Sequence, residues 1–203
     1  MLEKLSQDAL VIWATIDPIG TMALFAALTS HLTDQQRRKT AFKTVLYAGG
    51  VLLGSILIGQ LILNAMGIRL VSFQLGGGII LFLFGLQMIF GNDSNKAKQD
   101  PDHDIAVFPL AIPATATPGA ILAVILLTDN HIHPITTQIG TALVTLGVLC
   151  ITLILLLLSG KIIKLIGTGG ASILTRVMGM ILAAFSVELI MTALEIKQWV
   201  KLD

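Results

Sequence analysis

Six apolar stretches, each about the length of a membrane-spanning helix, alternate along this chain with short polar connectors. They cover residues 9–30, 44–63, 70–90, 105–128, 134–160 and 177–194. A helix needs about 20 mostly apolar residues to cross the hydrocarbon core of a bilayer, and each stretch meets or approaches that length. The pattern therefore predicts an all-α membrane protein with six transmembrane helices.

The composition agrees with a membrane protein and excludes several other classes. The 203 residues are 55% hydrophobic and 12% charged, and the mean hydropathy is +0.88. The formal net charge of +1 does not indicate a nucleic-acid partner. The single cysteine, Cys150, excludes an intramolecular disulfide. Because no phosphate-binding loop, nucleophile elbow or HExxH motif is present, we expect neither an enzyme nor a resident cofactor or metal.

Basic residues favour one side of the membrane. The connectors after spans one, three and five hold nine Lys and Arg residues, whereas the opposite side holds four. Since cytoplasmic loops carry the excess of Lys and Arg, both termini are predicted to lie outside. We therefore expect a multi-pass protein of the cytoplasmic (inner) membrane, embedded in the lipid bilayer alone or as a homo-oligomer.

Two halves of the chain share a pattern at an offset of about 100 residues. The matched positions are Asp17-Pro18 with Thr117-Pro118, Gly20 with Gly119, Gly59 with Gly160, Gly78 with Gly179, and Gln87 with Glu188. Because each half holds three spans, the second copy would be inverted in the bilayer. We predict two inverted three-helix repeats, 1–100 and 101–203, an architecture in which secondary transporters bind substrate at the repeat interface.

Spans one and four are predicted to be broken. Proline inside a helix removes a hydrogen bond and costs about 3 kcal/mol. It fits the first turn of a new helix, and Asp or Thr directly before it fits the N-cap. We expect each span to stop, run extended for a few residues, and restart at Pro18 or Pro118.

A restarted helix presents unpaired N–H groups and the positive end of its dipole, which together suit a carboxylate. Asp17 is the only acidic residue expected near mid-membrane, where ionisable groups are functional candidates. It suits the ammonium of a small zwitterionic substrate. The predicted substrate-binding residues are Thr15, Asp17, Pro18, Gly20, Thr21, Thr115, Thr117, Pro118 and Gly119. The alternative is that Asp17 only caps a helix and the prolines are simple kinks.

Two further polar residues are candidates for coupling or gating. Gln87 and Glu188 occupy matched positions toward the ends of spans three and six, where snorkelling or an interhelical hydrogen bond would explain them equally well. The coupling ion, H⁺ or Na⁺, is left open. The acidic run that ends with Asp102, His103 and Asp104 is typical of a solvated loop rather than a cation site.

Four segments resemble the MarC family of membrane proteins. IDPIGTMALFAALTS resembles the Asn/Asp-Pro-x-Gly signature of its first helix, and FPLAIPATATPGAI resembles its Pro-Leu-Ala-Ile-Pro motif. GGGIILFLFGLQMIF and RVMGMILAAFSVELI resemble its third and sixth helices. The motif core carried over by this resemblance is Asp17, Pro18, Gly20, Thr117, Pro118 and Gly119.

The resemblance implies a function as well as a fold. Some members, called SnatA, look like carriers of small neutral amino acids such as glycine and alanine. This chain departs from the family pattern at Thr21, Ala23 and Thr117, all near the inferred site. We expect a secondary transporter of small neutral amino acids, with export as one direction. The rival hypotheses are a cation or metal ion exporter and a non-transporting membrane regulatory protein.

Overall fold

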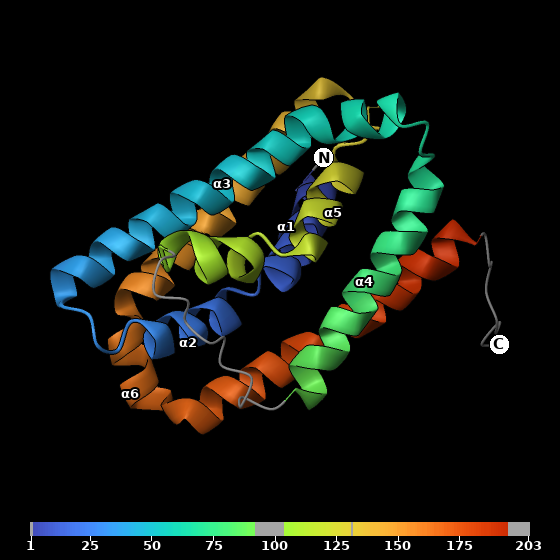
Figure 1. Ribbon diagram of the computed structural model, residues 1–203. Helices are drawn as coiled ribbons and strands as arrows, with labels where there is room; N and C mark the ends of the chain where they lie inside the picture. The colour runs from blue at the N-terminus through green and yellow to red at the C-terminus, as the bar shows by residue number, and fades with distance from the viewer. Residues whose placement is uncertain (1, 92–103, 131, 195–203) are drawn as a thin grey trace.

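The computed structural model describes residues 2–91, 104–130 and 132–194, and every regular element within those ranges is helical (Figure 1). The elements in chain order are α1 (Leu2–Ile16), α2 (Pro18–Leu28), α3 (Asp34–Ala65), α4 (Leu70–Phe90), η1 (Ala106–Thr115), α5 (Pro118–Leu127) and α6 (Ile135–Ala193). The predicted all-α class is confirmed.

Five segments are long and apolar enough to cross a membrane, and η1 with α5 makes a sixth when that bent pair counts as one span. The α1 and α2 helices together form the first, Glu3–Leu28. The α6 helix supplies two, because its backbone leaves the helical region at Gly167, with φ 70° and ψ 169°. Glycine tolerates this positive φ. We call Ile135–Leu165 and Ser172–Ala193 the first and second parts of α6.

Several helices extend beyond the apolar stretches that predicted them. The α3 helix begins at Asp34 rather than at residue 44, because Thr33 and Gln36 form a capping box at its N-terminus. Similarly, α1 begins at Leu2 rather than at residue 9. Hydropathy marks the part of a helix that suits lipid, whereas capping chemistry decides where the helix begins.

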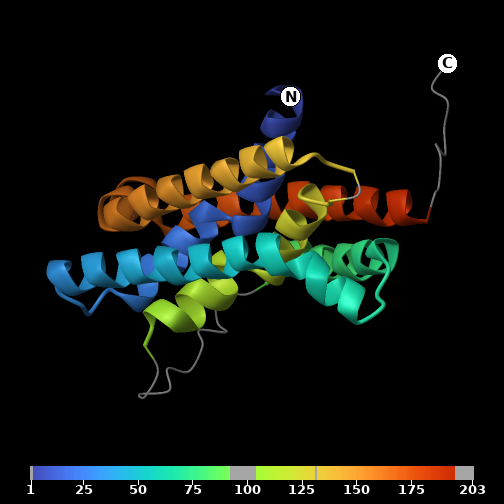
Figure 2. The same ribbon diagram turned by 90° about the horizontal axis from the view of Figure 1, so that it is seen from above.

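The two broken spans occupy the middle of the molecule. In Figure 1, α1, α2, η1 and α5 lie between α3 and the crossed pair formed by α4 and the second part of α6. Figure 2 shows α3 and the first part of α6 on opposite sides of α1 and α2. In the first span, half of the most apolar stretch is buried. In the four unbroken spans the corresponding share is 17 to 33%. The breaks are therefore enclosed by the unbroken helices.

Each half of the chain presents the same order of elements, a broken span followed by two further spans. This order is what the predicted repeat requires. The inversion of one half relative to the other, and the division at residue 100, stay predictions.

The α4 helix and the second part of α6 touch through glycines. A Cβ built at Gly85 would lie 2.9 Å from both the Ala183 nitrogen and the Gly179 carbonyl oxygen. Small residues let membrane helices approach closely enough for their backbones to touch. By contrast, a Cβ at Gly76, on the same helix, would meet nothing within 4 Å.

We predict that Gly85→Ala lowers the free energy of unfolding by about 1 to 3 kcal/mol, because the added methyl must push two backbones apart. Gly76→Ala is the matched control, and it should be neutral or stabilising by about 0.5 to 1 kcal/mol through helix propensity. Thermal unfolding of both purified variants in detergent measures the difference. Equal melting temperatures would contradict the backbone contact.

Candidate functional site

The break in span one is a single residue wide. Asp17 lies between α1 and α2 in the left-handed region, with φ 47° and ψ 68°, which Asp tolerates better than most residues. Its Oδ1 accepts a hydrogen bond from the Gly20 N–H at 3.1 Å, and Pro18 occupies the first turn of α2. The predicted restart at Pro18 is confirmed. The predicted extended run is wrong for this span, because Asp17 alone, in the left-handed region and capping α2, separates the two helices.

The break in span four is wider and bent. The η1 helix ends at Thr115, Ala116 leaves the helical region, and Thr117 is extended, with φ −65° and ψ 154°. The α5 helix then restarts at Pro118, and the two helices differ in direction by 54°. Thr117 Oγ1 accepts from the Ala120 N–H at 2.8 Å as the N-cap. Here the restart at Pro118 is as predicted, and the predicted extended run is reduced to one extended residue, Thr117.

The two breaks complete each other's hydrogen bonds. Thr117 Oγ1 donates to the Thr15 carbonyl of α1 at 2.8 Å. In return, Thr21 Oγ1 of α2 donates to the Ala114 carbonyl at 2.8 Å. Ala114 is four residues before Pro118, which has no N–H to offer it. A threonine from each break therefore reaches a carbonyl beside the opposite one.

The site is closed in this conformation. Asp17 is 6% exposed, and Thr15, Thr115 and Thr117 are fully buried. Thr15 and Thr115 donate their hydroxyl protons to the carbonyls of Val11 and Leu110, each at 2.8 Å. Within the described ranges, every buried polar side-chain atom has a hydrogen-bond partner. The buried hydroxyls of Thr15 and Thr115 are therefore occupied by carbonyls of their own helices.

Glycines set the spacing around the breaks. A Cβ on Gly20 would overlap the Asp17 carboxylate, and a Cβ on Gly119 would overlap Leu81 of α4. The predicted substrate-binding residues thus all lie at the two breaks, which the fold brings into contact. Their role in binding substrate stays a prediction.

The two coupling candidates lie elsewhere. Gln87 on α4 and Glu188 on the second part of α6 both occupy exposed positions. Neither side chain makes a hydrogen bond or ion pair with the breaks among the described residues. Their coupling or gating role also stays a prediction.

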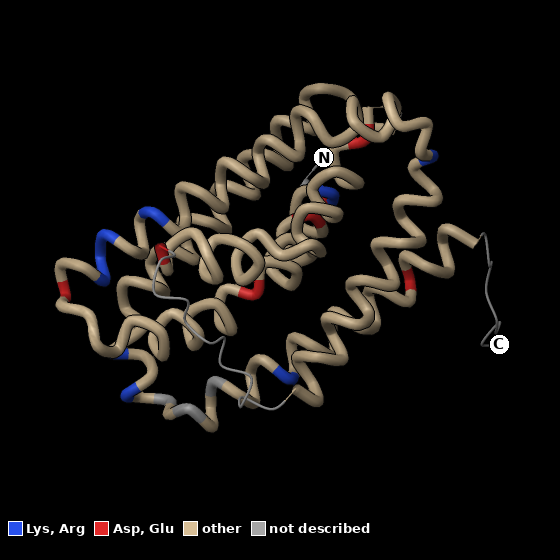
Figure 3. Tube along the Cα trace, viewed as in Figure 1, with Lys and Arg blue, Asp and Glu red and all other residues tan. Residues whose placement is uncertain are grey.

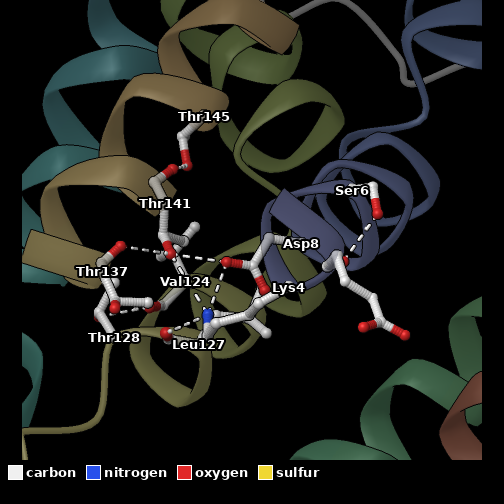
Figure 4. Close-up of polar contacts among 10 residues, drawn as sticks. Lys4, Ser6, Asp8, Val124, Leu127, Thr128, Thr137, Thr141 and Thr145 are labelled. Carbon is white, nitrogen blue, oxygen red and sulfur yellow. Dashed lines mark hydrogen bonds and ion pairs between the residues drawn. The ribbon is translucent and has the colours of Figure 1, made fainter. Parts of the chain in front are cut away.

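A buried polar cluster at the N-terminal end of span one was not predicted (Figure 4). Lys4 Nζ lies 2.6 Å from Asp8 Oδ2 and donates to the Leu127 carbonyl at 3.3 Å. Thr141 Oγ1 donates to the same Asp8 oxygen at 2.6 Å, and Asp8 is only 1% exposed. The cluster joins α1, the end of α5 and α6. The feature of the sequence that could have indicated this cluster is the four-residue spacing of Lys4 and Asp8, just outside the apolar stretch that begins at residue 9.

Gln60 of α3, also missed, fixes the same end of α5. Its Nε2 donates to the Thr128 carbonyl at 3.1 Å, and its Oε1 accepts from the Asn130 N–H at 3.1 Å. In the following turn, burial lowers the pKa of His133, and the positive charge of Lys4 lowers it further. The connection between α5 and α6 is therefore held by buried polar contacts.

The opposite end of span four is tied to α3. Asp104 Oδ2 lies 2.7 Å from Lys43 Nζ, and Asp104 Oδ1 accepts from the Ala106 N–H at 3.0 Å. The hydrogen bond from Lys43, followed by that from Ala106, lowers the pKa of Asp104. Asp102 and His103, from the acidic run noted in the sequence, lie outside the described residues.

Known proteins resemble this chain along nearly its whole length. The sequence model described as "MarC family integral membrane protein" matches residues 2–198. A UPF0056 membrane protein of Methanocaldococcus jannaschii is 36% identical over 192 residues, covering 90% of this chain and 92% of that protein. Another, from Buchnera aphidicola subsp. Schizaphis graminum, is 31% identical over 201 residues, covering 99% and 100%.

A third relative is the UPF0056 inner membrane protein MarC of Citrobacter koseri, 28% identical over 206 residues and covering 94% of this chain and 93% of its own length. No solved structure matches. These relatives are described as membrane proteins, and their names state no substrate.

We predict that Thr117→Val destabilises the protein by several kcal/mol. The change strands the Thr15 carbonyl and the Ala120 N–H, and each buried group without a partner costs about 1 to 3 kcal/mol. Thr117→Ser should retain both bonds and most of the stability. Thr152→Val is the matched control, because this buried threonine donates only to a carbonyl within its own helix. Chemical denaturation in detergent compares the three, and equal losses at 117 and 152 would contradict the link between breaks.

We predict that Lys4→Met destabilises the protein by about 1 to 3 kcal/mol, since it removes the cation from a buried carboxylate. The double variant Lys4→Met/Asp8→Asn should recover most of this loss, because the neutral amide oxygen of the introduced asparagine can still accept from Thr141. A double-mutant cycle on thermal stability measures the coupling. Additive effects of the two changes would contradict the buried pair.

Proposed function

Since this chain belongs to the MarC family of integral membrane proteins, we propose that it is a secondary transporter of small neutral amino acids such as glycine and alanine. The observation that carries the proposal is the meeting of two broken spans, one from each half of the chain, deep inside the helix bundle. Discontinuous helices at this depth are where many secondary transporters bind substrate. The proposal includes the cytoplasmic membrane, with both termini outside.

The chemistry of the breaks suits a zwitterion. In the closed conformation the hydroxyls of Thr21 and Thr117 are bonded to the carbonyls of Ala114 and Thr15. Separating the breaks releases two donors and two acceptors together. An amino acid carboxylate would take the hydroxyl donors and the N-terminal ends of α2 and α5, whereas its ammonium would take the carbonyls and Asp17. The substrate would thus replace the contacts that close the empty site.

The space beside the breaks favours a small side chain. Gly20 and Gly119 already lack room for a methyl group, and the adjoining Ala116 and Ala120 are buried. A bulky substrate side chain would need these helices to move farther apart than a methyl or a hydrogen would. Glycine and alanine therefore fit the proposal better than large neutral amino acids.

The buried cluster of Lys4, Asp8 and Thr141 suits a gate at one end of the site. It holds α1, α5 and α6 together at the predicted outer end of the first span. An alternating-access cycle needs one end of the site to open while the other stays closed. In this proposal, the cluster is intact while the outer side is closed.

We predict that Asp17→Asn lowers glycine and alanine transport about 10-fold or more while the protein still folds. Asparagine is an equally good N-cap and tolerates the left-handed region, so the variant removes only the charge. A charge-assisted hydrogen bond contributes about 1.5 to 3 kcal/mol, which corresponds to roughly 10- to 100-fold in affinity. Uptake of labelled amino acid into proteoliposomes, with matched amounts of folded protein, measures the effect.

Glu3→Gln is the control, since it removes an exposed carboxylate near the start of the same span. Transport by that variant should equal the wild-type rate. If Asp17→Asn also transports normally, Asp17 is a cap and the ammonium role is wrong. If wild-type proteoliposomes move no small neutral amino acid, the proposed function itself fails.

A further inference from the structure

A basic pocket of about 300 Å³ lies at one end of the bundle, where the end of α2, the start of α3 and the first part of α6 meet. Figure 3 shows basic residues gathered around the beginning of α3 and the neighbouring stretch of α6. The cationic side chains that line the pocket are Arg37, Arg38, Lys161 and Lys164. This pocket is separate from the helix breaks, whose residues do not line it.

The positive charge of the pocket is not neutralised by the described part of the chain. Asp34 is the single carboxylate in the lining. The ion pairs of the described residues, Lys4 with Asp8 and Lys43 with Asp104, lie elsewhere. Four cations around one cavity, with one carboxylate nearby, create a positive potential that attracts an anion.

Arg37 is held in place ready for such an anion. Its Nη2 donates to Ser159 Oγ at 3.0 Å, and its guanidinium carbon lies 6.0 Å from the centre of the Phe25 ring. Gly160 permits this approach, because a Cβ there would lie only 3.0 Å from Arg37 Nη1. Serine occupies one of five guanidinium donors, so the planar group keeps donors for a phosphate. Holding the side chain in advance reduces the entropy lost on binding.

The position and the remaining lining favour a lipid as the source of the phosphate. The candidate span of α3 begins at Asp34, and that of the first part of α6 ends at Leu165, so the pocket lies at the ends of two spans. Lipid phosphates occupy that level of a bilayer. Phe25, Leu156 and Leu157 give the same pocket an apolar wall. A phospholipid supplies both a phosphate and apolar carbon, whereas free phosphate supplies only the first.

We propose that this pocket binds the phosphate group of an anionic phospholipid in the leaflet that faces it, which the Lys and Arg distribution predicts to be cytoplasmic. The guanidinium of Arg37 and the three neighbouring cations hold the phosphate, and the apolar wall contacts the adjoining lipid carbon. The bound lipid joins α2, α3 and α6 at this end of the bundle. This site is additional to the proposed transport site and does not depend on it.

The test is thermal stabilisation of delipidated protein in detergent by added phosphatidylglycerol, with phosphatidylcholine and inorganic phosphate as separate arms. Wild-type protein should be stabilised by phosphatidylglycerol well beyond phosphatidylcholine. Lys161→Gln/Lys164→Gln should need roughly 30-fold more phosphatidylglycerol for the same shift, since each basic residue near an anionic surface contributes about five-fold. Lys39→Gln/Arg176→Gln removes two exposed charges outside the pocket and should respond like wild type.

Three outcomes would overturn the proposal. They are an equal response to both lipids, an unchanged response of the Lys161/Lys164 variant, and a full shift with inorganic phosphate to which lipid adds nothing. If the double variant fails to fold, Arg38→Gln, at an exposed position of α3, replaces it with an expected loss of about five-fold. A wild-type response from that folded variant would likewise count against the pocket.

Discussion

Backbone carbonyls that lose their helical partners inside a membrane need new donors, and this constraint shapes the centre of the molecule. Pro118 cannot donate to the Ala114 carbonyl, and the hydroxyl of Thr21 takes that place at 2.8 Å. The Thr15 carbonyl receives the Thr117 hydroxyl in the same way. Because lipid offers no alternative partner, the two breaks must lie against each other and inside a shell of unbroken helices. The burial of the first span follows from this requirement.

The same contacts make the closed conformation stable and yet reversible. Hydroxyl-to-carbonyl bonds between separate segments can be replaced one for one by the groups of a polar ligand, whereas the bonds within a helix cannot. Apolar packing around the breaks, including Ile16, Ala116 and Val124, keeps water from competing for these groups. If the breaks bind substrate as proposed, their polar groups would have partners both with and without it, which a carrier needs in order to change conformation in both states.

The part of this structure that depends on residues adjacent in the sequence could be predicted from the sequence. Asp17-Pro18 and Thr117-Pro118 combine a good N-cap with a good first helical residue, so the restarts were predictable from neighbours alone. The contacts between the two breaks could not be predicted from the sequence, because Thr21 and Ala114 are 93 residues apart and only the fold brings them together. Asp8 was overlooked because hydropathy set the start of the span after it. The π-helical η1 was not foreseen either, and inside it Phe108 and Ile112 leave the helical region directly before Pro109 and Pro113.

The two ends of the bundle differ in a way that bears on how the centre could open. At one end, Lys4 joins α1 to the last carbonyls of α5, and Asp8 joins it to α6 through Thr141. At the other end, Arg37 of α3 reaches Ser159 of α6 beside an open basic pocket. The first end is closed by buried contacts of Lys4, Asp8 and Thr141. At the second end the cations of the pocket form no ion pair with any described residue, and the ion pair of Lys43 with Asp104 is exposed. If the chain transports a substrate as proposed, we expect the breaks to separate more readily toward the second end, because fewer buried polar contacts between helices would be lost there.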